Sequence, residues 1–251
     1  MRIRFRFSKK GKVRFTSHRD VARMWERALR RGELPVALTE GFSPRPKMHF
    51  GLALSTAHES WGEYIDVDFR DPEAQSLDLQ KLPSTLTPLL PDGIAVESVA
   101  VIETSDMSLQ EAVTSCSWTL EAIGLELADA SSAVEGLLAA EEVFITRNRK
   151  GNEVTDDIRP CVLQLAVLGP VAAVTNPSGD SIITPAGTLL EAELATKPRG
   201  LRPSELLGAL EPPAVEGRVC RTHQWITLDG ARHEPLPAAA LSATHSTTRA
   251  S

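Results

Sequence analysis

The sequence predicts an α+β protein built from two tandem ferredoxin-like domains, each with the element order βαββαβ. Three observations lead to this prediction. Both halves of the chain contain short segments in which apolar and polar residues alternate, as they do in half-buried strands. Each half also contains segments with the apolar spacing of a helix, and a polar stretch at residues 104–114 separates the halves. We therefore expect domains at residues 1–103 and 115–229, and residues 104–114 form either a linker or a helical connection between them.

The first domain is expected to begin with a strand at residues 2–7, because apolar residues alternate there with arginines. This strand should have an apolar inner face and a basic outer face of Arg2, Arg4 and Arg6. Further strands are expected at 34–38, 48–54, 62–69 and 94–101, which is one strand more than the βαββαβ order contains. Helices are expected at 18–31 and 75–82, the second of which ends at Pro83.

The second domain should repeat this order. Strands are expected at 117–123, 143–147, 162–168, 171–174 and 218–228, and helices at 132–141 and 204–210. Ser131 is the expected cap of the first of these helices. Residues 230–251, which are rich in Ala, Pro, Ser and Thr, are expected to form a disordered tail.

Positive charge is concentrated at the start of the chain. The first 50 residues contain 14 Lys+Arg and 4 Asp+Glu, whereas the whole chain contains 27 and 33, so the remainder carries 13 against 29. An acidic protein that collects its cations in one segment is expected to bind a polyanion there.

The helix expected at residues 18–31 has signals at both ends. Ser17 is a suitable N-cap, and Gly32 can end the helix. Its apolar residues repeat at intervals of three and four, which predicts one buried face. The opposite face carries Arg19, Arg23, Arg27 and Arg30. These arginines form either a solvated face with salt bridges to other elements or a phosphate-binding surface, for which the guanidinium group is well suited.

The loop of residues 39–47 contains two prolines, and this stiffness reduces the entropy lost on binding. Phe42 either stacks on a base or plugs the space under the loop. Arg45, Lys47 and His49 alternate, so they should project to one side of an extended chain and continue the cationic surface.

A charged excursion at residues 147–160 is expected to form a hairpin. Arg147, Arg149 and Lys150 at its tip could add a phosphate contact from the second domain. Asp156, Asp157 and Arg159 instead suggest local pairing that holds the loop.

Two histidines are candidate catalytic groups. His18 and His49 could act as general base and acid on RNA, with Lys47 stabilising the transition state. The alternative for each is a capping or contact role. Phosphate-binding, dinucleotide-binding and nucleophile-elbow motifs are absent from the sequence, and we expect no cofactor.

The remaining composition indicates a cytoplasmic protein. Cys116, Cys161 and Cys220 are widely spaced, which fits free thiols better than a zinc site or a disulfide framework. His58, Glu59 and Glu63 do not have the spacing of a metal motif, and no metal is expected. No run of 18 apolar residues exists that would cross a membrane.

Four motifs resemble a known family. They are K-x-G-x-x-R-F-T-S-H-R-D at Lys9 to Asp20, E-R-A-L-R-R at Glu26 to Arg31, G-F-S-P-R-P-K at Gly41 to Lys47 and D-I-R-P at Asp157 to Pro160. Over most of residues 2–228 the chain is similar to the radical-SAM-linked domain of unknown function. That domain is fused to a radical SAM protein in some bacteria, and in actinobacteria it resembles a stand-alone protein encoded near ribonuclease E/G. The resemblance implies a context of RNA processing or modification and no mechanism. The chain lacks the C-x-x-x-C-x-x-C motif that would hold the radical SAM cluster.

Together these observations favour an RNA-binding accessory protein that recognises structured RNA mainly through phosphate. Phe42 and Trp61 are the candidate stacking residues. The alternatives are a metal-independent endoribonuclease on the same surface and an adaptor for ribonuclease E/G or a radical SAM enzyme. The predicted nucleic-acid contacts are Lys12, Arg14, Arg19, Arg23, Arg27, Arg30, Phe42, Arg45, Lys47, Arg147 and Lys150.

Overall fold

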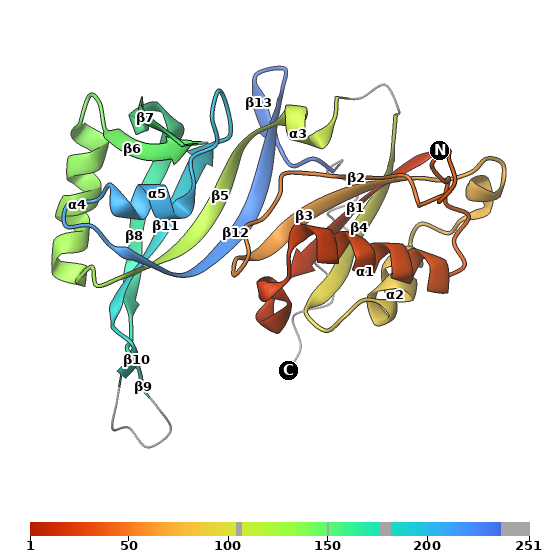
Figure 1. The fold of residues 1–251 in the computed structure, drawn as a ribbon, viewed down its shortest axis with the longest axis horizontal. Helices are drawn as coiled ribbons and strands as arrows, with labels where there is room; N and C mark the ends of the chain where they lie inside the picture. The colour runs from red at the N-terminus through yellow and green to blue at the C-terminus, as the bar shows by residue number, and fades with distance from the viewer. Residues whose placement is uncertain (104–106, 150, 176–181, 237–251) are drawn as a thin grey trace. The chain divides into compact units, whose positions relative to one another are not determined.

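The computed structural model describes residues 1–103, 107–149, 151–175 and 182–236, and it confirms a protein of mixed helices and strands (Figure 1). The chain forms two compact units. The first contains Met1–Val113 and the chain from His223 onward, and the second contains Thr114–Thr222. β12 (Val215–Leu228) begins in the second unit and ends in the first.

The first unit contains a four-stranded antiparallel arrangement. Its helices and strands are β1 (Arg2–Lys9), η1 (Gly11–Phe15), α1 (His18–Arg31), β2 (Met48–Phe50), β3 (Glu59–Asp68), η2 (Glu73–Ser76), α2 (Leu82–Leu86), η3 (Thr87–Leu89), β4 (Ile94–Ile102), α3 (Leu109–Ala112) and β13 (Ala231–His233). β1 lies between β4 and β3. β2 pairs with the other edge of β3, because Val67 has partners in both β1 and β2. The resulting strand order is β4-β1-β3-β2.

The core of this unit lies between α1 and the sheet (Figure 1). Ile3, Phe5 and Phe7 are buried on the side of β1 that faces the helix. Trp25 of α1 packs against them, with ring centroids 5.6 Å from Phe5 and 5.1 Å from Phe7. The predicted alternation of β1 therefore holds on its apolar side.

The expected basic outer face of β1 is wrong. Arg4 is buried and forms two hydrogen bonds to Asp66, Nε–Oδ1 at 2.7 Å and Nη2–Oδ2 at 2.9 Å. Arg2 pairs with Asp68, and the Arg6 Nη1 atom lies 2.8 Å from a Glu234 carboxylate oxygen. A buried guanidinium is expensive without a partner, and β3 provides carboxylates at the matching register.

Residues after β13 cover this ion-paired face. Arg4 Nη1 donates to the Pro235 carbonyl at 2.8 Å, and Leu236 is buried with Tyr64 and Leu109. Burial raises the pKa of the Tyr64 hydroxyl above its usual range. Residues 230–236 of the predicted disordered tail are thus part of the fold, while residues 237–251 lie outside the described residues.

Two local predictions in the first unit also need correction. Residues 34–38 form only isolated bridges, Val36 to Phe69 and Leu38 to Pro46, instead of a strand. Pro83 does not end a helix but occupies the first turn of α2, where its missing N–H costs nothing. Between the two expected domains, the short helix α3 agrees with a helical connection, the second of the two alternatives for this segment.

The second unit has its own antiparallel sheet. Its elements are β5 (Val113–Ile123), α4 (Leu127–Ala139), β6 (Phe144–Arg149), β7 (Asn152–Asp157), η4 (Arg159–Cys161), β8 (Val162–Val171), β9 (Val174–Thr175), β10 (Ile182–Thr184), β11 (Gly187–Ala195), α5 (Pro203–Gly208) and the first part of β12. The strand order is β12-β5-β11-β8. β6 and β7 form a separate hairpin.

Two sequence predictions differ from this arrangement. The strand expected at 143–147 belongs to the separate hairpin, and the central strand β11 was not predicted. The helix expected at 132–141 begins earlier, at Leu127 with Glu126 as N-cap, so Ser131 lies inside it.

Candidate nucleic-acid interface

α1 has the ends that the sequence predicts. The Ser17 hydroxyl accepts a hydrogen bond from the Asp20 backbone N–H at 3.2 Å and donates to the Asp20 carboxylate at 2.7 Å. The bond from Ser17 holds the pKa of Asp20 below its ordinary value. Gly32 is the C-cap, and its N–H donates to the Ala28 carbonyl. The helix is therefore fixed at both ends independently of a ligand.

The solvent side of α1 is a stripe of guanidinium groups. Trp25, Ala28 and Leu29 are buried on the core side. The opposite side carries Arg19, Arg23, Arg27 and Arg30, and Arg31 lies on its flank. All five are exposed, and together they are here called the arginine face. Arg31 was not in the predicted set, although its position in the last turn beside Arg30 could have identified it.

The arginine face is largely without counter-charges. Arg23 lies 3.4 Å from a carboxylate oxygen of Asp20, and both side chains are about half exposed. Arg19, Arg27 and Arg30 form no ion pair with any residue that the structure describes. Because like charges at this helical spacing repel by a few tenths of a kcal/mol per pair, such a stripe costs stability in the free protein.

Most other cations near the start of the chain have partners. Arg14 lies 3.6 Å from Glu59 and over the ring of Phe15. Lys10 lies 3.5 Å from the ring centroid of Trp61, so one face of this candidate stacking residue is occupied. Among the predicted contacts that precede the helix, Lys12 is exposed and Arg14 is held within the fold.

The loop after α1 is a closed hairpin tip. The Thr39 N–H donates to the Arg45 carbonyl at 2.8 Å, and the Arg45 N–H donates to the Thr39 hydroxyl at 3.1 Å. Leu38 and Pro46 form a bridge directly below these bonds. Phe42 and Arg45 are exposed at the tip, so Phe42 is not a plug under the loop.

The tip and the end of α1 lie at the same end of the first unit. The Leu34 N–H bonds to the Leu29 carbonyl at the end of the helix, and Val36 bridges to Phe69 at the end of β3. Phe69 in turn bonds to Met1, where β1 begins. Arg27, Arg30 and Arg31 therefore share this end with the tip, whereas Arg19 lies near the opposite end of a helix about 20 Å long.

Lys47 and His49 project to the other side of the sheet. Met48 and Phe50 pack against the α1 core, so by alternation their neighbours point away from it. His49 lies 3.4 Å from Asp68 and 3.3 Å from Arg2 on that side. The expectation that Arg45, Lys47 and His49 extend one cationic surface with the helix is therefore wrong for Lys47 and His49.

The two candidate catalytic histidines do not come together. The His18 ring packs edge-on against Phe50, with centroids 4.9 Å apart. His49 is the neighbouring residue in β2 and faces the opposite side of the sheet. The geometry therefore does not support their use as an acid–base pair.

In the second unit, Arg147 is held in a network of ion pairs. Its Nη2 atom lies 3.0 Å from Asp156 and its Nη1 atom 3.4 Å from Glu205. Arg199 contacts both carboxylates, at 3.3 and 3.0 Å. Lys150 lies outside the described residues. Arg147 thus joins the β6–β7 hairpin to α5 and is not available as a free phosphate contact.

The D-I-R-P segment also has a structural role. The Arg159 Nε and Nη2 atoms donate to the Leu138 carbonyl in the last turn of α4, at 3.2 and 2.9 Å. Asp157 accepts bonds from the backbone N–H groups of Val143 and Arg159. The Arg159 bonds satisfy a carbonyl at the helix end, as a C-terminal cap does, and the Asp157 bonds hold the chain on either side of the hairpin.

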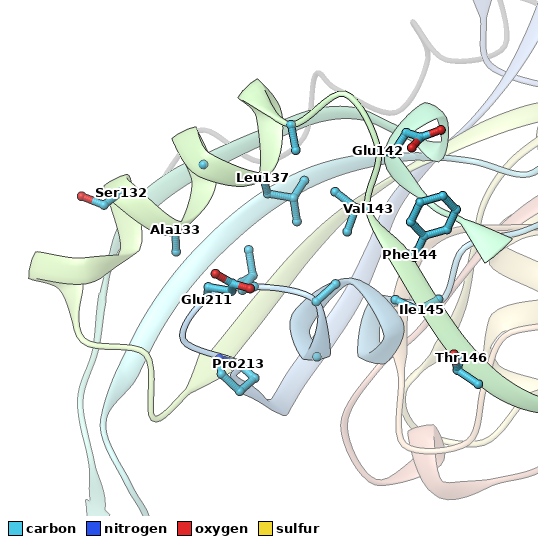
Figure 2. Close-up of a pocket in the computed structure, with 15 residues that line it drawn as sticks. Ser132, Ala133, Leu137, Glu142, Val143, Phe144, Ile145, Thr146, Glu211 and Pro213 are labelled. Carbon is cyan, nitrogen blue, oxygen red and sulfur yellow. The ribbon is translucent and has the colours of Figure 1, made fainter. Parts of the chain in front are cut away.

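The second unit contains a groove of about 880 Å³ beside α4 (Figure 2). Leu137 points from α4 into this space, and Glu142 and Glu211 stand at its edge. No Lys or Arg is among the described residues that line it. The negative charge of the two glutamates at this groove therefore repels a polyanion and attracts a cationic ligand.

Other classes of site are not found in the described part of the chain. No group of three or more His, Cys, Asp or Glu side chains there could hold a metal ion. None of the described helices is both long and apolar enough to cross a membrane. The three cysteines are free thiols, and burial raises the pKa of Cys161.

Comparison with known proteins identifies the family. Residues 2–196 match the model of an uncharacterized protein conserved in bacteria (DUF2344), and the chain belongs to this family. No curated protein matches the chain. A chain in the crystal structure of a Cbf5-Nop10-Gar1 complex is similar, with 11% identity and a TM-score of 0.45. The alignment covers 88% of this chain and 49% of that chain, so this protein spans about half the length of its structural match.

Proposed function

We propose that this protein binds RNA, through the arginine face of α1 and the loop tip that carries Arg45. The observation that supports the proposal is a contrast between two sets of cations. The three arginines of β1, and Arg147 and Arg199 in the second unit, lie within 4 Å of carboxylates. Those on the outer side of α1 have only the exposed Asp20 as a partner among the described residues.

Phosphate is the ligand that this arrangement suits best. A guanidinium offers paired N–H donors that match two phosphate oxygens, and five of them follow one helix. Bound phosphates would also remove the repulsion between neighbouring arginines. The family resemblance in the sequence supports RNA as the source of the phosphates, because it implies RNA processing or modification.

Binding to RNA should depend strongly on salt. If five cations of this surface contact phosphate, log Kobs should fall with log[salt] at a slope of about −3.5 to −4.5. The double variant Arg27→Gln/Arg30→Gln should reduce the magnitude of that slope by about 1.4 to 1.8. Fluorescence anisotropy with a labelled structured RNA measures both values.

A matched control separates this site from net charge alone. Lys81→Gln/Arg202→Gln removes two exposed cations from other elements and should leave the slope close to that of the wild type. A wild-type slope near zero, or equal losses in the two double variants, would contradict the proposal.

We also propose that each unit is a ferredoxin-like domain. The strand orders β4-β1-β3-β2 and β12-β5-β11-β8 support this assignment, as both have the first strand central and the last strand beside it. In the second unit the β6–β7 hairpin would be an insertion between α4 and β8. An experimental structure with a different strand order in either unit would reject it.

A second candidate function is that of a protein-interaction adaptor, and the groove beside α4 favours it. Its apolar residues and acidic edge suit a partner segment that carries both apolar and basic side chains. The proposed partners are a radical SAM protein or ribonuclease E/G, the two classes that the family resemblance implies.

Filling the groove tests this candidate. A Cβ added at Gly136 or Gly208 meets no atom within 4 Å, so Gly136→Leu can occupy the space without a clash at the backbone. Pull-down of a tagged partner after nuclease treatment should succeed with the wild type and fail with Gly136→Leu. The adaptor hypothesis fails if the wild type captures neither partner, or if Gly136→Leu captures it equally well.

A further inference from the structure

Phe42 stands alone at the tip of the loop between α1 and β2. Its relative accessibility is 109%, whereas the next most exposed large apolar side chain in the described residues, Val215, reaches 70%. A fully exposed phenyl ring makes no contact with the core of its own chain. It therefore lacks the favourable free energy of burial that most phenylalanines contribute to folding. The side chain therefore contributes little to the fold.

The backbone beneath Phe42 is held in place. Thr39 and Arg45 exchange two hydrogen bonds, and the Leu38–Pro46 bridge and the Lys47 N–H bond to Ala37 continue the closure. A ring presented on a closed tip loses less entropy on binding than a ring on a long open loop.

The surroundings of the ring are cationic. Arg45 follows three residues later on the same tip, and the C-terminal arginines of α1 lie at the same end of the unit. An exposed aromatic ring beside phosphate-binding groups is the combination by which proteins hold single-stranded nucleic acid, since the bases stack on the ring while the cations follow the backbone. A perfect duplex offers no free base face for this purpose.

We infer that the RNA bound at this site contains an unpaired base, which stacks on Phe42. This inference rests on the proposed function and adds the class of RNA to it. The arginines bind the phosphates of paired and unpaired RNA alike, whereas Phe42 stacks only on an unpaired base. The protein should therefore bind a loop, a bulge or a single-stranded end more tightly than a fully paired helix.

The test compares two RNAs with the same number of phosphates, a hairpin with an adenosine-rich loop and a fully paired duplex. The variant Phe42→Ala should weaken binding of the hairpin about 5- to 150-fold, the range that loss of one stacked base produces, and should leave duplex binding unchanged. Phe42→Trp should retain hairpin binding. Val215→Ala removes another exposed large apolar side chain, on β12, and serves as the control with no expected effect.

A direct readout is the fluorescence of 2-aminopurine in the hairpin loop. Stacking on Phe42 should quench it with the wild type and with Phe42→Trp, and Phe42→Ala should restore it. Equal hairpin affinity of the wild type and Phe42→Ala overturns the inference, and so does an equal loss on hairpin and duplex.

Two further outcomes separate this inference from related ideas. If Phe42→Ala is silent while Arg27→Gln/Arg30→Gln lowers the salt slope, the RNA-binding proposal stands and the stacking role fails. Loss of binding to vesicles of anionic lipid in Phe42→Ala, without loss of hairpin binding, assigns the ring to a membrane surface and overturns the inference.

Discussion

The buried pair of Arg4 and Asp66 offers a sharp test of the distinction between structural and ligand-binding arginines. Both side chains are less than a tenth exposed, and two hydrogen bonds join them. A third bond joins Arg4 to the Pro235 carbonyl. Replacing Arg4 with Met keeps most of the side-chain length but leaves the Asp66 carboxylate buried without its cation.

The expected cost of Arg4→Met is about 3 to 5 kcal/mol, the typical penalty for leaving one charge of a buried pair uncompensated. With a urea m-value of about 2 kcal/mol/M, this loss lowers the unfolding midpoint by roughly 1.5 to 2.5 M. The double variant Arg4→Met/Asp66→Leu removes both charges and should recover most of that loss.

The matched control makes the same substitution on the arginine face. Arg27→Met should change the free energy of unfolding by no more than about 0.5 kcal/mol, because the side chain is exposed and has no ion pair in the described structure. Urea unfolding followed by circular dichroism measures all three variants. If Arg4→Met costs no more than Arg27→Met, the division of the arginines into two classes is mistaken.

Three further predictions concern the fold. Arg159→Ala removes two hydrogen bonds from the last turn of α4 and should cost about 1 to 3 kcal/mol, seen as faster amide hydrogen exchange at that turn. Burial acts to raise the pKa of Asp68, but Arg2 outweighs it and holds the pKa below its ordinary 3.8. The stabilisation is therefore present above about pH 4 and is lost as pH falls through the folded-state pKa, so the stability gap between wild type and Asp68→Asn should narrow in urea titrations near pH 3. Gly93 has φ +94°, and an added Cβ would meet the Lys10 carbonyl oxygen, so Gly93→Ala should cost more than about 1 kcal/mol in thermal unfolding.

The sequence predicted best where local signals agree with tertiary packing. α1 has a cap at each end, a spaced apolar face and high burial of that face, so its bounds of His18–Arg31 match the expectation closely. For Phe42 the sequence left two alternatives open, a ring exposed for stacking and a ring buried under the loop. Whether an aromatic residue in a loop is buried or exposed depends on the chain packed beneath it, which the sequence does not display.

The strand β11 shows where local signals mislead. Its sequence, GTLLEAELA, is rich in Leu, Glu and Ala, which favour helix. It nevertheless forms the strand between β5 and β8, and its alternate side chains, such as Leu190 and Ala192, are buried. Pairing on both edges overrides the intrinsic preference, because strand stability depends on the neighbours more than on the residue.

The arginines illustrate a similar limit for the site. Arg4 and Arg27 both lie opposite an apolar face in their own elements, so periodicity alone assigns both to solvent. The two arginines differ in burial because Arg4 pairs with the Asp66 carboxylate of β3 and is covered by the residues after β13. Asp66 and Asp68 alternate in β3, and this pattern could have indicated partners for the β1 arginines once the two strands were paired.

The most direct measurement of RNA binding by the arginine face is ultraviolet crosslinking of the protein to RNA in cells, followed by mass spectrometry of the crosslinked peptides. We expect crosslinks within residues 24–45, centred on Phe42, and their loss in Arg27→Glu/Arg30→Glu. Crosslinks confined to the β6–β7 hairpin or to β1, or an unchanged yield from the charge-reversed variant, would contradict the account.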